Sequence, residues 1–367
     1  MKLRKIFSRL FDTRAAGLYF LLFAASIGIA TFIENDYGTS AAQKVIYKAW
    51  WFELMLLLFA GSIVYNVVQY RMVKQRKWSL ILFHLSILVI LLGAGITRYL
   101  GFEGVMHIRE NSSANSFLSA DTHLKFEVTA DGTTYDFTEP VLFASLGRNN
   151  FKESYLVGDQ LLEVEVKDFI PNPKQELKEI ATGQPILKLV VAGANGREEY
   201  FIKKGETRSL GGLVYNFRDS SISNAINLAY ENDALSFSTN RALTQTVMAT
   251  QKVDTIQPSK DYQPLVLRAL YSDGINNFVF SEFQPAGEIV ISSEDPKVKN
   301  ESMSAVVVEV TVDGQTQQAY VYGNKGLPGN PSKLQFDTIN LAISYGAKQI
   351  EVPFHIKLNK FILEKYP

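Results

Sequence analysis

The chain offers few side chains that could perform chemistry or hold a metal. It contains no cysteine, which excludes thiolate nucleophiles, zinc–thiolate sites, iron–sulfur clusters and disulfide redox pairs. A neutral imidazole can hydrogen-bond, relay protons or ligate a metal through one ring nitrogen. The remaining strong nitrogen ligands are therefore the four histidines, His84, His107, His123 and His355.

His84 is the strongest candidate for a functional residue because it lies within an apolar segment and is expected to be buried among membrane spans. It follows Trp78 by six residues, which places it about 9 Å into a helix that begins there, at 1.5 Å per residue. Ionisable groups are costly inside a bilayer and often functional. Leu80, Ile87 and Leu88 flank it at helical spacing, and a flat macrocycle such as haem would fit beside them. The residues alone leave structural hydrogen bonding and metal ligation equally open.

The other candidate residues have simpler explanations. His107 lies just beyond the last apolar segment, whereas His123 and His355 occupy strand-like sequence. A polar partner or water is available at such positions, so hydrogen bonding is the favoured interpretation. Arg98 ends an apolar segment, where arginine is typical of an interfacial anchor. Roles for Arg98 and Arg109 in binding a cofactor's anionic groups stay open.

Three apolar segments near the N-terminus determine where His84 lies. They cover about residues 15–33, 50–70 and 78–100. Each meets the length of about 20 apolar residues that a helix needs to cross a hydrocarbon core of roughly 30 Å. A cleaved signal peptide is an alternative for the first, but its long run ends at Glu34 without a small-x-small exit. We therefore predict a transmembrane domain over residues 1–100.

Charges in the short loops predict the orientation of these spans. Basic residues precede the first span and fill the loop 71–77, whereas the loop 34–49 is mixed. The positive-inside rule then places the N-terminus in the cytoplasm and residues after about 100 outside it. Trp50, Trp51 and Tyr99 would lie at an outer aromatic belt, and Trp78 at the inner one.

From Gly101 onward the sequence pattern changes to period two. Apolar and polar residues alternate in 123–128, 161–166, 185–191, 305–312 and 353–358, as in half-buried strands. Four dipeptides between such runs favour tight hairpin turns: Asp131-Gly132, Asn195-Gly196, Asp273-Gly274 and Asp313-Gly314. We predict an antiparallel β sandwich or barrel-like domain over residues 101–367, without a long helix. The fold class is thus membrane α followed by all-β.

A weak internal echo links residues 190–205 with 310–326, each a strand, a turn, an aromatic strand and a glycine exit. It indicates two related β units, although generic hairpin chemistry produces the same pattern. The sequence contains no P-loop, GxSxG or HExxH motif and no dense basic patch for nucleic acid. No catalytic residue is assigned, and binding or scaffolding is favoured over catalysis in this domain.

Several segments together resemble the ResB (CcsB) family. They are FIENDYGTSAAQKVIYKAWWFELML (32–56), RKWSLILFHLSILVILLGAGITR (76–98), GFEGVMHIRE (101–110) and the terminal PFHIKLNKFILEKYP (353–367). This family is the membrane component of the System II cytochrome c synthase. The chain looks most like the N-terminal, ResB-like part of a fused CcsBA-type synthase.

The resemblance implies a multi-pass protein of the bacterial inner (cytoplasmic) membrane that helps move haem outward for attachment to apocytochrome c. His84 matches the family's third-span histidine, an axial ligand of haem b iron. The partner histidine and the external haem ligands belong to the CcsA portion, which this chain lacks. The resemblance therefore implies that a CcsA-type subunit, or a missing fused C-terminal half, completes the site. It also implies a further C-terminal membrane helix, so the chain is expected to be truncated.

Two functions stay open at this point. The first is a non-autonomous subunit of a cytochrome c haem lyase, with His84 as one haem ligand and an extracytoplasmic β domain that positions a partner. The second is a membrane-anchored β scaffold or receptor that binds no haem, in which His84 only bonds to another helix. An enzyme of the outer domain is the least favoured, because no nucleophile–base pair is visible.

Overall fold

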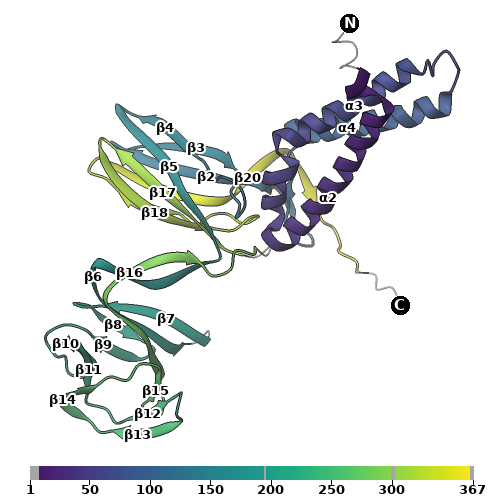
Figure 1. Cartoon of the computed structure of the whole chain (residues 1–367). Helices are drawn as coiled ribbons and strands as arrows, with labels where there is room; N and C mark the ends of the chain where they lie inside the picture. The colour runs from purple at the N-terminus through teal and green to yellow at the C-terminus, as the bar shows by residue number, and fades with distance from the viewer. Residues whose placement is uncertain (1–7, 194–195, 299–301, 364–367) are drawn as a thin grey trace. The chain divides into compact units, whose positions relative to one another are not determined.

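The computed structural model describes residues 8–193, 196–298 and 302–363 (Figure 1). The chain divides into two compact units. The first comprises Met1–Pro173 and Ser293–Pro367, and the second, Lys174–Ser292, is inserted into it. The first unit thus combines the N-terminal helices with β structure drawn from two distant parts of the chain.

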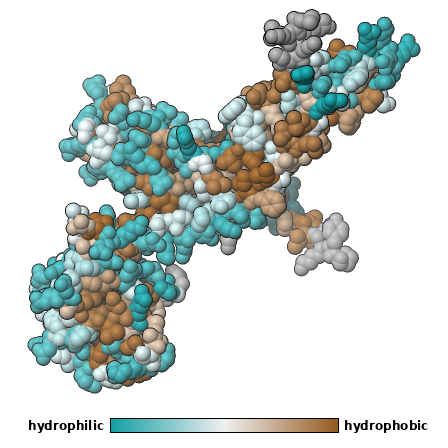
Figure 2. Space-filling view, in the orientation of Figure 1, coloured by the Kyte–Doolittle hydropathy of each residue, from teal (hydrophilic) through white to brown (hydrophobic). Residues whose placement is uncertain are grey.

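The predicted spans form helices that are long and apolar enough to cross a membrane. They are α2 (Thr13–Ala42) with the π-helix η1 (Gln43–Tyr47), α3 (Trp50–Gln69) and α4 (Trp78–Leu100). The first helix continues well past Ile33 and kinks at Gly38, whose φ of 78° is easily adopted only by glycine. Hydrophobic side chains gather on the surface of the helices in Figure 2. The chain is therefore a membrane protein.

α3 contacts both α2 and α4. Near the end of α3, Asn66 is only 6% exposed, so its amide needs partners. Its Nδ2 donates to the carbonyls of Ser62 (2.7 Å) and Phe11 (3.1 Å), and its Oδ1 accepts from the Thr13 hydroxyl (2.9 Å). Such interhelical hydrogen bonds are typical of membrane helix pairs. They fix the start of α2 against the end of α3.

Two sheets of the first unit enclose one hydrophobic core, which makes a β sandwich. In β2, Leu124, Phe126 and Val128 are fully buried and alternate with polar residues, as period two predicts. One sheet contains β1 (Gly104–Val105), β2 (Ser113–Ala130), β3 (Thr133–Val141), β19 (Ser332–Gln335) and β20 (Ile339–Lys357). The other contains β4 (Lys152–Val157), β5 (Gln160–Pro171), β17 (Ser304–Val312) and β18 (Gln315–Gly323).

The inserted unit has its own core between two further sheets, rich in aromatic rings such as Tyr215, Tyr271 and Phe278. One sheet contains β6 (Pro173–Gly193), β7 (Gly196–Lys203), β12 (Leu243–Val247), β13 (Lys252–Ile256), β15 (Ala269–Ser272) and β16 (Asn277–Ser293). The other contains β8 (Thr207–Leu210), β9 (Leu213–Asn216), β10 (Ala225–Glu231), β11 (Ala234–Thr239) and β14 (Ser259–Pro264). β9 and β10 pair in parallel, an exception to the predicted antiparallel order.

The turn predictions had mixed outcomes. Asp131-Gly132 and Asp313-Gly314 have positive φ at both residues and close the hairpins β2–β3 and β17–β18, as predicted. The type I′ prediction for Asp273-Gly274 is wrong, because only the glycine has positive φ. There the Asp273 carboxylate instead accepts the backbone N–H of Ile275 and Asn276, which makes an Asx-type loop. Asn195 lies outside the described residues.

The predicted strand character of the β part agrees with the structure. The described residues after α4 contain no α-helix, and antiparallel pairs dominate the four sheets. The two segments that echo each other are parts of the hairpins β6–β7 and β17–β18, which lie in different units. The predicted fold class, three membrane helices followed by β sheets, is confirmed.

Candidate functional site

His84 lies two turns into α4 and is oriented by its own helix. Its Nδ1 lies 2.7 Å from the carbonyl oxygen of Leu80, one turn earlier. With the proton on Nδ1, this nitrogen donates to the carbonyl and Nε2 keeps a free lone pair. Metal-bound histidines are commonly fixed in this way, by a hydrogen bond from the ring nitrogen that does not bind the metal. The Phe83 ring meets the imidazole edge-on, with 5.7 Å between centroids.

The expectation that His84 is buried among the spans of this chain is wrong. α4 has no buried residue within the described chain, and His84 is only half-buried. The physical reason is the small number of helices: α3 covers one side of α4, while Leu82, Phe83 and Ile90 stay 67%, 61% and 68% exposed. This apolar surface is open to lipid or to helices of another chain.

A charged contact joins the start of α3 to the end of α4. These two helix ends lie far from the basic loop 71–77 that connects the helices. The Arg98 guanidinium contacts the Glu53 carboxylate and donates to the Tyr47 carbonyl, and the Tyr99 hydroxyl donates to Glu53 at 2.7 Å. A charge in an apolar environment is tolerated when it is paired in this way. Arg98 thus acts as a structural anchor between helices in this structure.

Glu53 is the residue whose role sequence reasoning missed. It was visible only as an acidic interruption near the start of the second span, with no partner assigned. The signal that could have found it is the basic residue at the far end of the next span, since antiparallel neighbouring helices bring these two positions to the same level.

The other histidines lie outside the helices and apart from His84. His107 is exposed in the segment after β1, and His355 is exposed on β20. His123 on β2 has its Nδ1 3.2 Å from the Asp121 carbonyl, and partial burial lowers the pKa of its imidazole. Arg109 is an exposed loop residue. Across residues 8–193, 196–298 and 302–363, no cluster of three or more His, Cys, Asp or Glu side chains could hold a metal.

The aromatic residues assigned to membrane belts are exposed at helix ends. Trp50 is 74% exposed, Trp78 63% and Tyr99 70%, whereas Trp51 is 37% exposed and packs edge-on against Phe52. Side chains of this kind at the ends of apolar helices suit the membrane–water interface, where one part of the ring is apolar and the other is hydrated.

The class of protein is a membrane-anchored β protein. It has three apolar helices, with a histidine inside the third, and sheets that enclose two separate cores. A model of the ResB-like family matches residues 72–155, which include α4 with His84 and the first strands of the β part. Protein NrfI of Wolinella succinogenes is 48% identical to the chain over 108 residues, or 29% of this chain. Residues 72–155 of the chain are thus similar to the ResB-like family.

The similarity to Protein NrfI covers a small part of that protein. The matched region amounts to 12% of its length, so the chain corresponds to a fraction of the curated relative. The similarity to the ResB-like family therefore rests on the region that contains the third helix and the entry into the first sandwich.

Proposed function

We propose that this chain is a membrane component of cytochrome c biogenesis that contributes one axial imidazole, from His84, to haem b as it crosses the bacterial cytoplasmic membrane. The observation that carries the proposal is the place of His84. It is the one histidine in the first 100 residues, it lies inside a membrane helix, and that helix falls in the ResB-like region. Orientation with the N-terminus inside, from the positive-inside rule, places His84 nearer the cytoplasmic surface.

The residues present fit one half of a haem site. Bonding of Nδ1 to Leu80 leaves Nε2 available and sets the plane of the imidazole. The exposed apolar side chains of Leu80 and Phe83 beside it, 46% and 61% exposed, offer a flat surface to a hydrophobic macrocycle.

The second half of the site has to come from elsewhere. The other three histidines lie in or next to the β structure, apart from α4. A CcsA-type membrane subunit, or a fused C-terminal half, would supply the second ligand and cover the exposed face of α4. Haem is the molecule that would finally be attached covalently to apocytochrome c. This chain would orient it through His84, exclude water with α4, and present a β platform outside the membrane.

The proposal is tested by absorption spectroscopy on the chain purified with its CcsA-type partner. We expect a Soret band that His84→Ala weakens and added imidazole restores, because free imidazole can occupy the position of the missing ring. Purified alone, the chain should retain little haem, since one imidazole leaves the second axial position open.

His355→Ala is the matched control, because it removes an exposed imidazole from the same chain. An identical spectrum for wild type and His84→Ala would refute the ligand role. Absence of haem from the wild-type complex would instead favour the scaffold function, in which His84 only hydrogen-bonds within its helix.

A further inference from the structure

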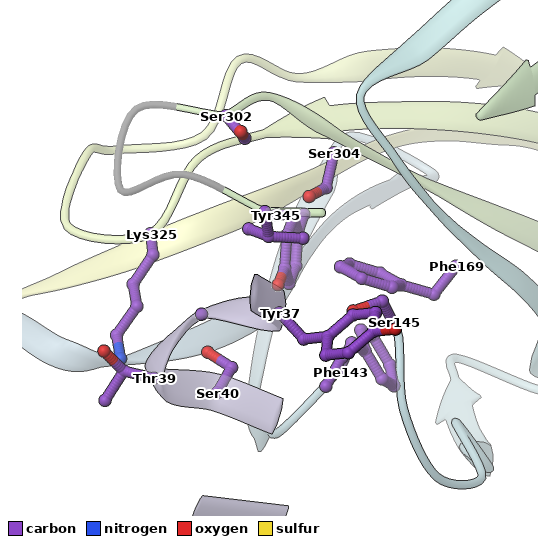
Figure 3. Close-up of a pocket in the computed structure, with 13 residues that line it drawn as sticks. Tyr37, Thr39, Ser40, Phe143, Ser145, Phe169, Ser302, Ser304, Lys325 and Tyr345 are labelled. Atoms are coloured by element: carbon purple, nitrogen blue, oxygen red, sulfur yellow. The ribbon is translucent and has the colours of Figure 1, made fainter. Parts of the chain in front are cut away.

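A cavity of about 250 Å³ lies in the first unit, where the C-terminal end of α2 meets the first sandwich (Figure 3). Residues from α2, from the loop after β3, from β5, from the segment before β17, from the loop after β18 and from β20 line it. It has no relation to His84, which lies on α4. Its size is just below the roughly 300–1,000 Å³ of ordinary ligand pockets, so a small molecule would fill it.

Polar contacts hold the α2 side of the cavity in place. The kink at Gly38 lets Val298 approach closely, and the Val298 N–H donates to the Asp36 carbonyl at 3.1 Å. Lys297 pairs with the Asp36 carboxylate at 3.3 Å. A side chain at position 38 would meet Val298 and strain the positive φ, so this approach depends on glycine.

A second set of contacts holds the loop after β3. The Lys44 ammonium donates to the Leu142 carbonyl at 2.9 Å and to the Asn149 side-chain oxygen. Asn149 in turn accepts the Ala144 N–H at 3.0 Å and donates to the Ala144 carbonyl at 2.9 Å. These bonds fix the stretch that carries Phe143 and Ser145. The walls of the cavity are therefore built before any ligand arrives.

One side of the cavity is aromatic. The rings of Phe143, Phe169 and Tyr345 pack against one another with centroids 5.9 to 6.3 Å apart. On this side the Ser145 hydroxyl is buried and finds no hydrogen-bond partner among the residues that the structure describes. A buried hydroxyl without a partner is unfavourable, so a ligand atom that bonds to it would remove a cost.

The opposite side is cationic. In Figure 3 the Lys325 side chain extends toward Thr39 and Ser40, away from the rings of Phe143 and Phe169. Within the described chain, Lys325 forms no ion pair; the residue as a whole is exposed, and partial burial of its ammonium group lowers the pKa of that group. The nearby Asp121 is already paired with Lys48 at 3.3 Å. The Glu34 carboxylate, which also acts on the Lys325 ammonium, accepts the Thr39 hydroxyl at 2.8 Å. Among the described residues, the site therefore presents an ammonium group that has no carboxylate in direct contact.

We propose that this cavity binds a small aromatic carboxylate, with the carboxylate on Lys325, the ring against Phe143 and Phe169, and a polar ring substituent on Ser145. An inorganic anion such as phosphate would leave the aromatic wall without a partner. A purely apolar molecule would leave the ammonium and the buried hydroxyl unpaired. An aromatic acid satisfies both sides, and a charge-assisted bond to Lys325 would supply much of the affinity.

The test uses the full chain in nanodiscs, without haem or a partner, and ligand-observed NMR with 4-hydroxyphenylacetate as the probe. We expect saturable binding that falls at least about tenfold in Lys325→Gln, because a charged hydrogen bond contributes more than 1.4 kcal/mol, the equivalent of a tenfold change. The uncharged probe 4-hydroxyphenylacetamide should bind the wild-type chain more weakly than the acid does, by the same factor of about ten or more. Ser145→Ala should abolish the preference for the hydroxylated probe over phenylacetate.

Lys333→Gln is the matched control, since Lys333 is an exposed lysine of the same sandwich that does not line the cavity. His84→Ala should bind the probe like wild type, which separates this inference from the haem proposal. Equal binding of the acid and the amide, equal binding by Lys325→Gln, or no saturable binding at millimolar probe would each overturn it.

Discussion

Two tyrosines in the core of the inserted unit allow a sharp test of how buried hydroxyls affect stability. Tyr215 on β9 and Tyr271 on β15 are both fully buried, and both rings contact Phe278, at 5.5 and 5.4 Å between centroids. Their hydroxyls differ. Tyr271 accepts the Val266 N–H and donates to the Val266 carbonyl, each at 3.0 Å. The Tyr215 hydroxyl has no partner within the described chain.

The same substitution should therefore act with opposite sign at the two positions. Tyr271→Phe leaves the N–H and the carbonyl of Val266 unpaired, which costs about 1–3 kcal/mol. The Tyr215 hydroxyl loses its hydrogen bonds to water on folding and gains none in the described protein. Tyr215→Phe removes this hydroxyl and should therefore stabilise the unit by about 1 kcal/mol. Because both changes delete one oxygen from the same core, the difference between the variants should be about 2–4 kcal/mol.

Hydrogen exchange with mass spectrometry is the suitable assay, because the three tryptophans, Trp50, Trp51 and Trp78, lie in the membrane helices and do not report on this unit. Exchange of peptides from β9 to β16 gives the free energy of opening of the inserted unit, and β17–β18 serves as an internal reference. If Tyr215→Phe destabilises the unit as much as Tyr271→Phe, the reasoning from hydrogen-bond satisfaction is refuted.

Three further predictions concern other contacts. Asn149→Ala should destabilise the first unit by about 2–3 kcal/mol in denaturant unfolding, since it removes the acceptor of the Lys44 ammonium and of a backbone N–H, whereas Asn149→Asp should retain most of the stability. Glu53→Leu should lower the thermal stability of the chain in detergent, because it leaves the Arg98 cation unpaired. The double variant Glu53→Leu/Arg98→Leu should be less destabilised, and a double variant as unstable as the single one would contradict this reasoning. Burial raises the pKa of Tyr271 from 10.0 to about 12, so this tyrosine ionises at lower pH in the unfolded chain than in the folded one. The inserted unit should therefore keep its full stability below pH 10 and become less stable as the pH rises toward 12. Circular dichroism against pH should show a smaller loss of stability in Tyr271→Phe.

The elements of this protein could be predicted from local sequence pattern. The apolar runs have the length of a membrane crossing, and α3 and α4 match them nearly residue for residue. Aspartate–glycine dipeptides at 131 and 313 predicted their hairpins, because positive φ at consecutive positions is a local requirement that few residue pairs meet. The prediction failed at Asp273, where the side chain captures backbone N–H groups and changes the turn.

Positions that depend on contacts across the chain could not be predicted in this way. The polar nature of His84 within an apolar helix was evident, but its exposure on α4 depends on how few helices pack around it. The inserted unit, Lys174–Ser292, has no compositional boundary, since strands on both sides of the junction follow the same alternation.

The sequence by itself determined the membrane helices, the β character of the rest and the candidate ligand His84, because period, length and residue type are properties of neighbouring residues. Only the tertiary structure decided which strands share a core and which side chains meet. The cavity brings Lys325, Ser145 and Phe169 together from separate segments of the first unit. Nothing in the local pattern of any one of these segments carries that information, because the pairing free energy that unites them arises only when the sheets close.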